Sequence, residues 1–480
     1  MQNYKHFFYT LSPRIDAPFT YISPMTQLPL NDRPTPNPTS NPSPETTPFN
    51  FFHQWYPVSP IEDLDPTRPT AVTVLGLRFV IWKPKDATEF RIFRDRCPHR
   101  LAPLSQGRID ESGTLMCSYH GWQFDPSGTC TTIPQSDNPE LLEKQPENYC
   151  AIAYPSQQAN DLLWLWPDTD TADLAQSTPR PHTPPNDASK GFVWSSMVRD
   201  LEYDWQTLVE NVADPSHVPF SHHGIQGNRN KARPIPMEIT SSTPTEINVK
   251  TAGTITFRPP CLMDYAIQFG DKKLGLIVYC IPVTPGKSRI VAQFARNFAH
   301  RLHRFTPRWW EHIKTRNAVL DGDMALLHFQ ERELTQSADL SPSWKESYTM
   351  PASADRLVIE FRRWFDRHCQ GQFPWSEVGL SPNYDPPLTD DRTILDRYHQ
   401  HTIHCSSCRG ALKAIQNWQL ALVALAILLT IITALLPDAA RLPYGLPLAA
   451  FTLISLSISA TLKFWLEPQF LYVPYIHADR

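Results

Sequence analysis

Two short segments in the first third of the chain each pair a cysteine with a histidine. The first is Cys97-Pro-His99, and the second, after seventeen intervening residues, is Cys117-Ser-Tyr-His120. The flanking stretches, such as "FRIFRDR", are typical of short strands, so each pair is expected on a loop. Two loops of this kind can converge, and the spacing therefore predicts one metal centre held by two thiolates and two imidazoles.

Two kinds of centre fit these four side chains. Zinc accepts two cysteines and two histidines in a tetrahedron. Each loop, however, offers one thiolate and one imidazole, which favours a [2Fe-2S] cluster whose first iron takes both sulfurs and whose second takes both nitrogens. Such a cluster can accept an electron from a ferredoxin. We favour the cluster, and structural zinc is the alternative.

A second group of ionisable side chains lies in "ENVADPSHVPFSHHG", where Asp214, His217, His222 and His223 fall within ten residues. His217 and His222 would lie near one another if a helix ended between them, and Pro219 would help to end it. With one carboxylate they would form the two-histidine, one-carboxylate face of a mononuclear non-haem Fe(II) site, which leaves positions open for oxygen and substrate. Surface or capping histidines are the alternative.

The carboxylate is expected from the helix predicted over "RNAVLDGDMALLHFQERELT", which offers Asp321 and Asp323. The apolar residues of this helix, Leu320, Met324 and Leu327, would face one way while an acid near its start points into the pocket. Both could instead be acids that stabilise the start of the helix.

The chain of 480 residues is long enough for more than one core. We divide the chain by its turn formers, its strand-like alternation, its helical stretches and a Pro-, Thr- and Asp-rich connector. The predicted parts are a disordered Pro-rich leader (1–48), an all-β domain (49–168), a linker (169–190), an α+β catalytic domain (191–370), a tail with a Cys-x-x-Cys pair (371–412), a transmembrane helical hairpin (413–466) and a C-terminal tail (467–480).

Two charge-free apolar runs, Trp418 to Leu436 and Leu446 to Leu462, are just long enough to cross a bilayer. A buried helical hairpin of a soluble domain is the alternative. Arg409, Lys413 and Lys463 lie at the ends of the runs that would share one membrane side, which favours soluble domains on the cytosolic side or its organelle equivalent.

Composition excludes other classes. The net charge is -4 with no basic tract, so nucleic acid is not an expected partner. The nine cysteines are odd in number and thinly spread, unlike a secreted disulfide scaffold. No Gly-rich dinucleotide fingerprint follows a strand, so reducing power must come from a separate protein.

The two loops resemble those of the Rieske iron-sulfur family, whose C-x-H and C-x-x-H motifs match Cys97, His99, Cys117 and His120. "YHGW" and "CPHR" followed by "AP" are similar to the ring-hydroxylating oxygenases of that family. The resemblance implies a helix-grip catalytic domain in which His217 and His222 bind iron, and an exchange of roles between His222 and the adjacent His223 stays open. It also implies that the acid Asp214 hydrogen-bonds the iron ligand His217 and bridges to the cluster histidine, here His120, of a neighbouring subunit in a homotrimer.

Further motifs narrow the family. "CPHRLAPLSQGRID", the doubled histidine of "DPSHVPFSHHG" and the tail "RYHQHTIHCSSC" before two apolar runs resemble the pheophorbide a oxygenase group of plants and cyanobacteria, close to chlorophyllide a oxygenase. The seven-residue spacing from Asp323 to Gln330 is similar to that of monomeric-type members, and on this resemblance we favour Asp323 over Asp321 as the carboxylate ligand. The resemblance implies a location in a cyanobacterial thylakoid or plasma membrane or a plastid envelope, and the leader favours a cyanobacterial origin.

The pair Cys405-Ser-Ser-Cys408 lies outside both predicted sites. In the group it resembles, such a pair is regarded as a thioredoxin-reducible switch, and two nearby thiols can form a disulfide if the turn allows it. Because His399, His401 and His404 are close in sequence, a structural zinc half-site is the alternative.

Together these features predict a membrane-anchored Rieske oxygenase. Electrons from a ferredoxin or ferredoxin-type reductase would activate O2 to oxygenate a large apolar substrate, by resemblance a chlorophyll-derived tetrapyrrole such as pheophorbide a or chlorophyllide a. The rival hypothesis is a redox-sensing or electron-transfer membrane protein that keeps both metal sites, uses Cys405 and Cys408 as its output and turns over no small molecule.

Overall fold

The computed structural model describes residues 49–138, 140–181, 191–337, 343–381 and 389–479. The predicted leader, residues 1–48, lies outside the described residues, as does the part of the predicted linker from 182 to 190. The described part of that linker contains one short helix, α2 (Ala172–Ser177).

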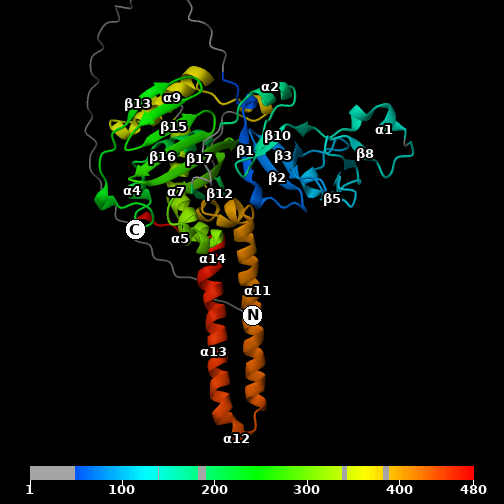
Figure 1. The fold of residues 1–480 in the computed structure, drawn as a ribbon, viewed down its shortest axis with the longest axis vertical. Coiled ribbons are helices and arrows are strands. Elements are labelled where there is room, and N and C mark those ends of the chain that lie inside the picture. The colour runs from blue at the N-terminus through cyan, green and yellow to red at the C-terminus, as the bar shows by residue number, and fades with distance from the viewer. Residues whose placement is uncertain (1–48, 139, 182–190, 338–342, 382–388, 480) are drawn as a thin grey trace, which may run out of the picture. The chain divides into compact units, whose positions relative to one another are not determined.

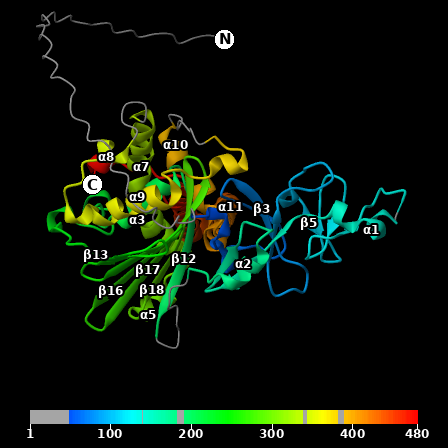
Figure 2. The same ribbon diagram turned by 90° about the horizontal axis from the view of Figure 1, so that it is seen from above.

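Small antiparallel sheets form the first part of the described chain (Figures 1 and 2). Their strands follow from β-branched and aromatic runs such as "LRFVIW" in β3, where Phe79 to Trp82 are all buried. In spatial order the sheets are β1 (Tyr56–Pro60), β11 (Leu162–Leu165) and β10 (Ser156–Ala159); β2 (Thr70–Val74), β3 (Leu77–Trp82), β4 (Arg91–Arg94) and β9 (Ala153–Tyr154); and β5 (Arg108–Ile109), β6 (Leu115–Met116), β7 (Gln123–Phe124) and β8 (Cys130–Thr132).

A larger antiparallel sheet forms the second part. It has seven strands in the order β12 (Val193–Leu201), β18 (Lys287–Arg296), β17 (Lys272–Thr284), β16 (Leu262–Phe269), β15 (Thr254–Arg258), β14 (Ile247–Lys250) and β13 (Glu238–Ser242). Helix α3 (Trp205–Ala213) contacts β16, β17 and β18, and α9 (Arg356–Cys369) contacts β13 and β14. The apolar face of α9 recurs at helical spacing in Leu357, Phe361, Trp364 and Phe365, all of them buried, which is why this helix packs on the sheet.

The remaining helices are α1 (Leu141–Lys144), α4 (Val218–Ser221), α5 (His300–Phe305), α6 (Arg308–Glu311), α7 (Asn317–Ser337), α8 (Trp344–Ser347), α10 (Asp391–Ile394), α11 (Ser406–Leu435), α12 (Asp438–Ala440), α13 (Leu446–Thr461) and α14 (Pro468–Leu471). Two π-helical turns also matter for the sites: η7 (His312–Arg316), which leads directly into α7, and η10 (Tyr398–Thr402).

Two hydrophobic cores support the sheets, and a third cluster at the base of the hairpin contains Ile313, Cys405, Cys408, Leu412, Ile415 and Phe470. The larger core joins residues of the first two small sheets to residues of the seven-stranded sheet, and β1 contacts β12, β17 and β18. The smaller core contains Val80, Phe93 and Phe124 together with Cys97 and Cys117, and it lies under the two Cys-and-His loops. An all-β part followed by an α+β part is the fold class predicted from the sequence.

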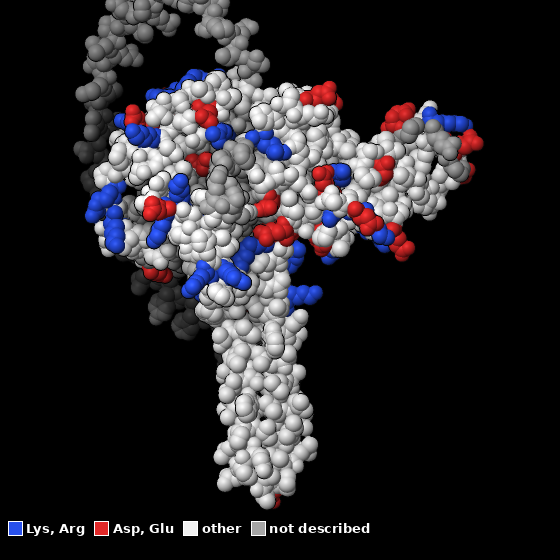
Figure 3. Space-filling model, viewed as in Figure 1, with Lys and Arg blue, Asp and Glu red and all other residues white. Residues whose placement is uncertain are grey.

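Helices α11 and α13 form an antiparallel hairpin joined by α12. Two segments, α11 itself and the continuous helical stretch Asp438–Leu471 that contains α13, are long and apolar enough to cross a membrane, by length and composition, and only 6% and 17% of their most apolar windows are buried. A core helix of a soluble domain would be mostly buried. Figure 3 shows that the visible face of the hairpin carries almost no charged side chains between its base and its turn.

Candidate functional site

The two Cys-and-His loops have the same backbone geometry. In the first, the N–H of Cys97 donates to the carbonyl of Ala102 at 2.8 Å, and the carbonyl of Cys97 accepts from Leu101 at 3.0 Å. In the second, Cys117, Trp122 and Gly121 repeat these bonds at 2.8 and 3.0 Å. The residue four after each cysteine, Leu101 or Gly121, has a left-handed backbone with φ of 61° or 73°. The repeat places the two cysteines and two histidines as a matched set.

The loops separate sulfur from nitrogen. The thiols of Cys97 and Cys117 are buried and hydrogen-bonded to each other. The rings of His99 and His120 lie further out, with centroids 4.4 Å apart, and the ring of Trp122 stacks on His99 at 4.7 Å. Thiols on the inside and imidazoles on the outside match the division expected for a cluster with one iron on each side.

The chemistry of these donors favours a cluster over a single zinc ion. Among the described residues, two sets of donor atoms lie within 4.8 Å of one another, close enough for one ion, and these four residues form neither set. Burial raises the pKa of Cys97 to about 12, while backbone N–H groups of His99 and Arg100 favour the thiolate. A bound cation would supply the remaining stabilisation of the charged sulfur.

The second predicted site is assembled by a single helical turn. His217 and His222 flank α4, and their Nε2 atoms lie 3.1 Å apart. Pro219 does not end a helix, as the sequence had suggested: α3 ends earlier, at Ala213, and Pro219 stands in the first turn of α4. Proline is tolerated there because N–H groups of a first turn have no intrahelical partner.

Asp323 faces both histidines. Its carboxylate oxygens lie 3.8 Å from Nε2 of His217 and 3.4 Å from Nε2 of His222, and these three donors form one of the two compact sets. The side chains of Asn211 and Ser221 hydrogen-bond to the same carboxylate. Two imidazoles and one carboxylate directed at one point could hold a divalent ion.

Asp321 contacts two arginines instead. Its oxygens lie 2.7 Å from Arg199 and 2.5 Å from Arg397, and all three side chains are buried. Because both of its oxygens already contact arginines, this carboxylate pairs with buried charges inside the protein and is not directed at the histidines. The preference for Asp323 over Asp321 therefore agrees with the geometry.

The hydrogen bond of His217 orients its metal-facing nitrogen. Its Nδ1–H donates to the backbone carbonyl of Asp214, which leaves Nε2 free to bind an ion. The Asp214 carboxylate itself accepts from the N–H of Ser216 at 2.7 Å and lines the adjacent cavity. The expected link between Asp214 and His217 is thus made by the carbonyl and not by the acid.

The electrostatics of the set favour a cation. Burial lowers the pKa of His222 to about 4 and also lowers that of His217, so both imidazoles are neutral near pH 7. Burial raises the pKa of Asp323 well above its ordinary value. A divalent ion would oppose this shift and favour the charged form of the carboxylate.

His223 takes no part in this set. It lies next to His222, but its Nδ1 accepts the backbone N–H of Arg229 at 3.1 Å, and it is not among the donors of either compact group. The exchange of roles between His222 and His223 left open by the sequence is therefore not favoured by the structure.

Residues after the helical hairpin return to this site. The hydroxyl of Tyr475 donates to the carbonyl of Ser221 at 2.7 Å, and Nε2 of His477 donates to the carbonyl of Gly322 at 2.8 Å. A Cβ at Gly322 would lie 2.8 Å from the Ser221 carbonyl and 2.9 Å from the Tyr475 hydroxyl, so only glycine allows this approach. Nothing in the sequence pattern connected the C-terminal tail with the histidines.

A largely apolar cavity of about 320 Å³ opens beside the three donors. Its wall includes Asp214, His217, His222 and Asp323, and the sheet and α7 supply apolar residues: Met197, Ile267, Leu276, Val278, Ile290, Phe294 and Leu320. An apolar cavity with a few convergent polar groups is the usual form of a small-molecule site.

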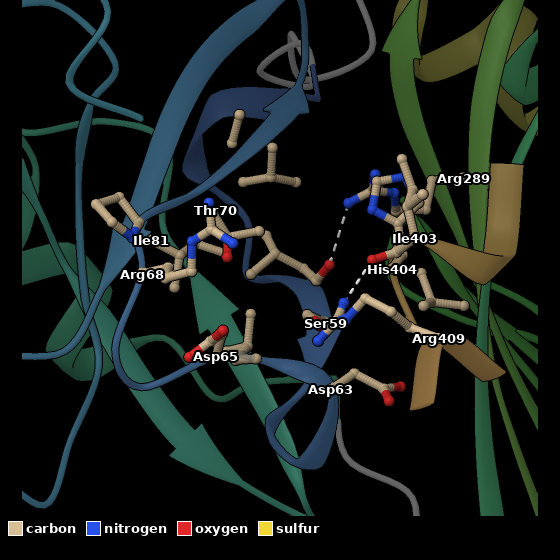
Figure 4. Close-up of a pocket in the computed structure, with 16 residues that line it drawn as sticks. Ser59, Asp63, Asp65, Arg68, Thr70, Ile81, Arg289, Ile403, His404 and Arg409 are labelled. Atoms are coloured by element: carbon tan, nitrogen blue, oxygen red, sulfur yellow. Dashed lines mark hydrogen bonds between the residues drawn. The ribbon is translucent and has the colours of Figure 1, made fainter. Parts of the chain in front are cut away.

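A second cavity, of about 220 Å³, is lined by Asp63, Arg289, His404 and Arg409 (Figure 4). Its charged groups already have partners: Arg289 pairs with Asp200 at 2.6 Å, and Asp63 lies 2.5 Å from Arg308. Neither compact set of metal donors lines it.

Cys405 and Cys408 are buried at the start of α11. They form the other compact set of donors, together with His401 and with His312, which sequence reasoning missed.

The comparisons with known proteins agree with this arrangement. Residues 54–150 match the Rieske [2Fe-2S] domain, and residues 257–340 match the pheophorbide a oxygenase family. The chain is 38% identical over 457 residues to a protein of Oryza sativa subsp. japonica named pheophorbide a oxygenase, chloroplastic, covering 90% of this chain and 85% of that one. It is 34% identical to flavonoid 8-hydroxylase 2, chloroplastic, of Ocimum basilicum, covering 88% and 86%.

A solved structure extends the comparison to the fold. Dicamba monooxygenase bound to dicamba matches with a TM-score of 0.54 at 18% identity, over 67% of this chain and 98% of that one. The chain therefore belongs to the pheophorbide a oxygenase family of Rieske oxygenases, enzymes with a [2Fe-2S] cluster and a mononuclear iron.

Proposed function

We propose that this chain is a membrane-anchored oxygenase that uses electrons from a ferredoxin or ferredoxin-type reductase to oxygenate a chlorophyll-derived tetrapyrrole such as pheophorbide a or chlorophyllide a. In this proposal Cys97, His99, Cys117 and His120 hold the cluster, and His217, His222 and Asp323 hold the iron. The observation that carries it is the apolar cavity that opens directly onto the three iron donors.

The lining of the cavity supports an apolar substrate. A volume of about 320 Å³ is at the lower end of the range that encloses a small ligand. A tetrapyrrole would therefore insert the edge to be oxidised and leave the rest of the macrocycle outside. Ferrous iron on two imidazoles and one carboxylate would supply oxygen activation at that edge, while the apolar side chains hold the substrate and exclude water.

Electron entry is proposed through the exposed side of the cluster domain. His99 is exposed and His120 is half-buried, so the nitrogen side of the cluster faces outward, where a protein donor or a neighbouring subunit can approach. In a homotrimer, Asp214 would link the cluster of one subunit to the iron of the next. The carbonyl of Asp214 already orients His217, which leaves its carboxylate available for a contact across the interface.

The hairpin of α11 and α13 is proposed as the membrane anchor. Its outward side chains include Leu420, Leu435 and Leu453, which are 72%, 78% and 66% exposed, and burial in lipid is the ordinary environment for such a surface. Trp418 and Trp465 lie near the base of the hairpin, as interfacial aromatic residues do.

The charges at the two ends of the hairpin support an orientation. Arg409, Lys413 and Lys463 lie at the base, where Lys463 is paired with Glu467 at 3.1 Å, so the charges of Arg409 and Lys413 remain in excess; at the turn Arg441 is balanced by Asp438 at 3.0 Å. An excess of positive charge favours the cytosolic or stromal side. Two relatives carry the word chloroplastic in their names, and we propose a cyanobacterial thylakoid or plasma membrane, or a plastid envelope, as the location.

The test begins with detergent-purified chain kept without oxygen. We expect two acid-labile sulfides per chain, two irons in the cluster and one at the second site. Ferredoxin-driven oxygen uptake should then rise on addition of pheophorbide a or chlorophyllide a, in step with loss of the pigment. A flavonoid is the comparison substrate, because one relative at 34% identity is named a flavonoid hydroxylase.

Two variants divide the outcome. Cys97→Ser should abolish the Rieske absorbance. His217→Ala should keep that absorbance and lower the rate of oxygen uptake by at least about 100-fold. Intact metal content with no pigment-dependent turnover would favour the redox-sensing alternative or another substrate. If His217→Ala also removed the cluster, the division into two sites would be wrong.

A further inference from the structure

The buried cysteine pair at the start of α11 has two imidazoles beside it. Nε2 of His401 lies 3.1 Å from Nδ1 of His312 and 3.3 Å from Sγ of Cys408. Nδ1 of His312 lies 3.5 Å from Sγ of Cys405 and 3.6 Å from Sγ of Cys408. All four side chains are at most 1% exposed, and their donor atoms all lie within 4.8 Å of one another.

These separations are those of a tetrahedron around zinc. Zinc–nitrogen bonds of about 2.0 to 2.1 Å and zinc–sulfur bonds of about 2.3 Å place two nitrogens about 3.3 Å apart and a nitrogen and a sulfur about 3.5 Å apart. The observed values of 3.1 Å and of 3.3, 3.5 and 3.6 Å lie within a few tenths of an ångström of these edges.

The surroundings orient the donors toward one point. Nδ1–H of His401 donates to the carbonyl of Val198 at 2.6 Å, which leaves Nε2 without its proton and directed at the thiols. The backbone N–H of Cys408 donates to Sγ of Cys405 at 3.5 Å, a bond that stabilises a thiolate at the start of a helix.

The other histidines near the pair are engaged elsewhere. His404 lies 3.3 Å from Asp200 and lines the neighbouring cavity (Figure 4), and His399 is exposed and lies 2.6 Å from Asp396. Of the three histidines close in sequence to the pair, only His401 reaches it. The fourth donor, His312, comes from a distant part of the chain.

We propose that Cys405, Cys408, His401 and His312 bind one zinc ion, as a third metal centre whose role is structural. Four protein donors complete the tetrahedron and leave no open position for a reactant, and zinc undergoes no redox change. A buried set of two thiols and two imidazoles with no ion would hold polar groups in an environment that disfavours them.

The position of the centre gives it a mechanical role. His312 begins η7, which leads into the helix that carries Asp323, and His401 is bonded to β12 of the large sheet. Cys405 is the N-cap of α11, the first helix of the hairpin. One ion would therefore join the hairpin to the sheet and to the helix that supplies the carboxylate of the iron site.

The experiment is elemental analysis of the full chain purified in detergent, with zinc, iron and sulfide measured on the same sample. We expect one zinc per chain beside the iron. Cys405→Ser and His312→Ala should lose the zinc while two sulfides and the Rieske absorbance remain. The matched controls are His399→Ala, a neighbouring imidazole, and Cys150→Ser, a thiol outside the set, and both should retain zinc.

A second readout covers the case in which these variants fold poorly. Unmodified chain depleted of zinc and loaded with Co²⁺ should show the intense visible bands of tetrahedral cobalt bound to two thiolates, and added zinc should remove them. Cys408→His, which keeps four donors, should still bind one zinc.

Three results would overturn the proposal. The first is the absence of zinc from the unmodified chain. The second is a disulfide between Cys405 and Cys408 in protein purified without reductant, and the third is iron in place of zinc at these four residues. The disulfide would favour the thioredoxin-responsive switch. Each is independent of substrate turnover, so the zinc proposal and the oxygenase proposal can fail separately.

Discussion

Asp321 and Asp323 lie two residues apart on α7, yet Asp321 contacts Arg199 and Arg397 while Asp323 faces His217 and His222. Gly322 between them packs on the Ser221 carbonyl. Three consecutive residues therefore connect the ion-pair network inside the protein to the proposed iron site, and each can be tested separately.

Replacement of Asp323 and replacement of Asp321 should have different effects on iron content and thermal stability. Asp323→Ala should lower iron by one per chain, with sulfide and thermal stability nearly unchanged, because it removes a ligand. Asp321→Ala leaves two buried guanidinium groups with one carboxylate fewer, and loss of one partner of a buried ion pair costs about 3–5 kcal/mol. The measurement is the thermal unfolding and the iron content of both variants on matched samples. Equal stability loss in the two variants would contradict the prediction.

Gly322→Ala should damage the iron site without damaging the helix. In a helix interior alanine is normally favoured over glycine by about 1 kcal/mol, but here the new Cβ meets the Ser221 carbonyl and the Tyr475 hydroxyl. We expect α7 to shift away from His222 and iron to fall, with the Rieske absorbance retained. Gly410→Ala is the matched control, since its Cβ would have no neighbour within 4 Å, and it should leave iron unchanged.

Removal of the hairpin should release the chain from the membrane. The Ser459 hydroxyl lies 3.3 Å from the Gln419 carbonyl, so a short Gly-Ser linker can replace residues 420–458 without displacing the segments on either side. The full chain should stay in the membrane fraction after an alkaline carbonate wash, and the shortened chain should appear in the supernatant with its iron and sulfide. A full chain that washes off would exclude the anchor.

Glu331 should make the protein less stable as pH rises. Burial raises the pKa of Glu331 to about 8 from an ordinary value of 4.5, and the charge of Asp204 acts in the same direction. Between these values the folded state holds a proton that the unfolded state has lost, so the free energy of unfolding falls with increasing pH, by at most about 1.4 kcal/mol per pH unit. This contribution is fully present below pH 4.5 and lost by about pH 8.

The measurement is thermal unfolding from pH 5 to pH 8 for the unmodified chain and for Glu331→Gln. The glutamine is neutral at every pH, so its variant should show a smaller decline and be the more stable of the two at pH 8. Parallel pH profiles would mean that another group is responsible.

The sequence was most informative where ligands lie close together along the chain. The Cys-and-His loops and the pair His217 and His222 are local motifs, and the structure brings both sets together. For the acid beside the histidines, helical spacing left two candidates, Asp321 and Asp323. The spacing alone does not reveal that two arginines contact Asp321.

Contacts between residues far apart in the sequence could not be predicted from the sequence. His312 stands alone in the sequence, and only the packing of η7 against η10 and α11 brings it to the cysteines. The misreading of Pro219 had a different cause: proline both ends helices and begins them, and the choice depends on the preceding residues, where α3 had already stopped.

The contact between Tyr475 and Ser221 sets an order of assembly. A ribosome releases residues after the hairpin last, so the hydroxyl that holds the Ser221 carbonyl arrives only once both apolar helices have been made. A nascent chain whose hairpin has not yet been synthesised would lack this support beside His222. In the membrane-anchored protein proposed above, completion of the pocket beside the proposed iron ligands would therefore follow synthesis of the hairpin.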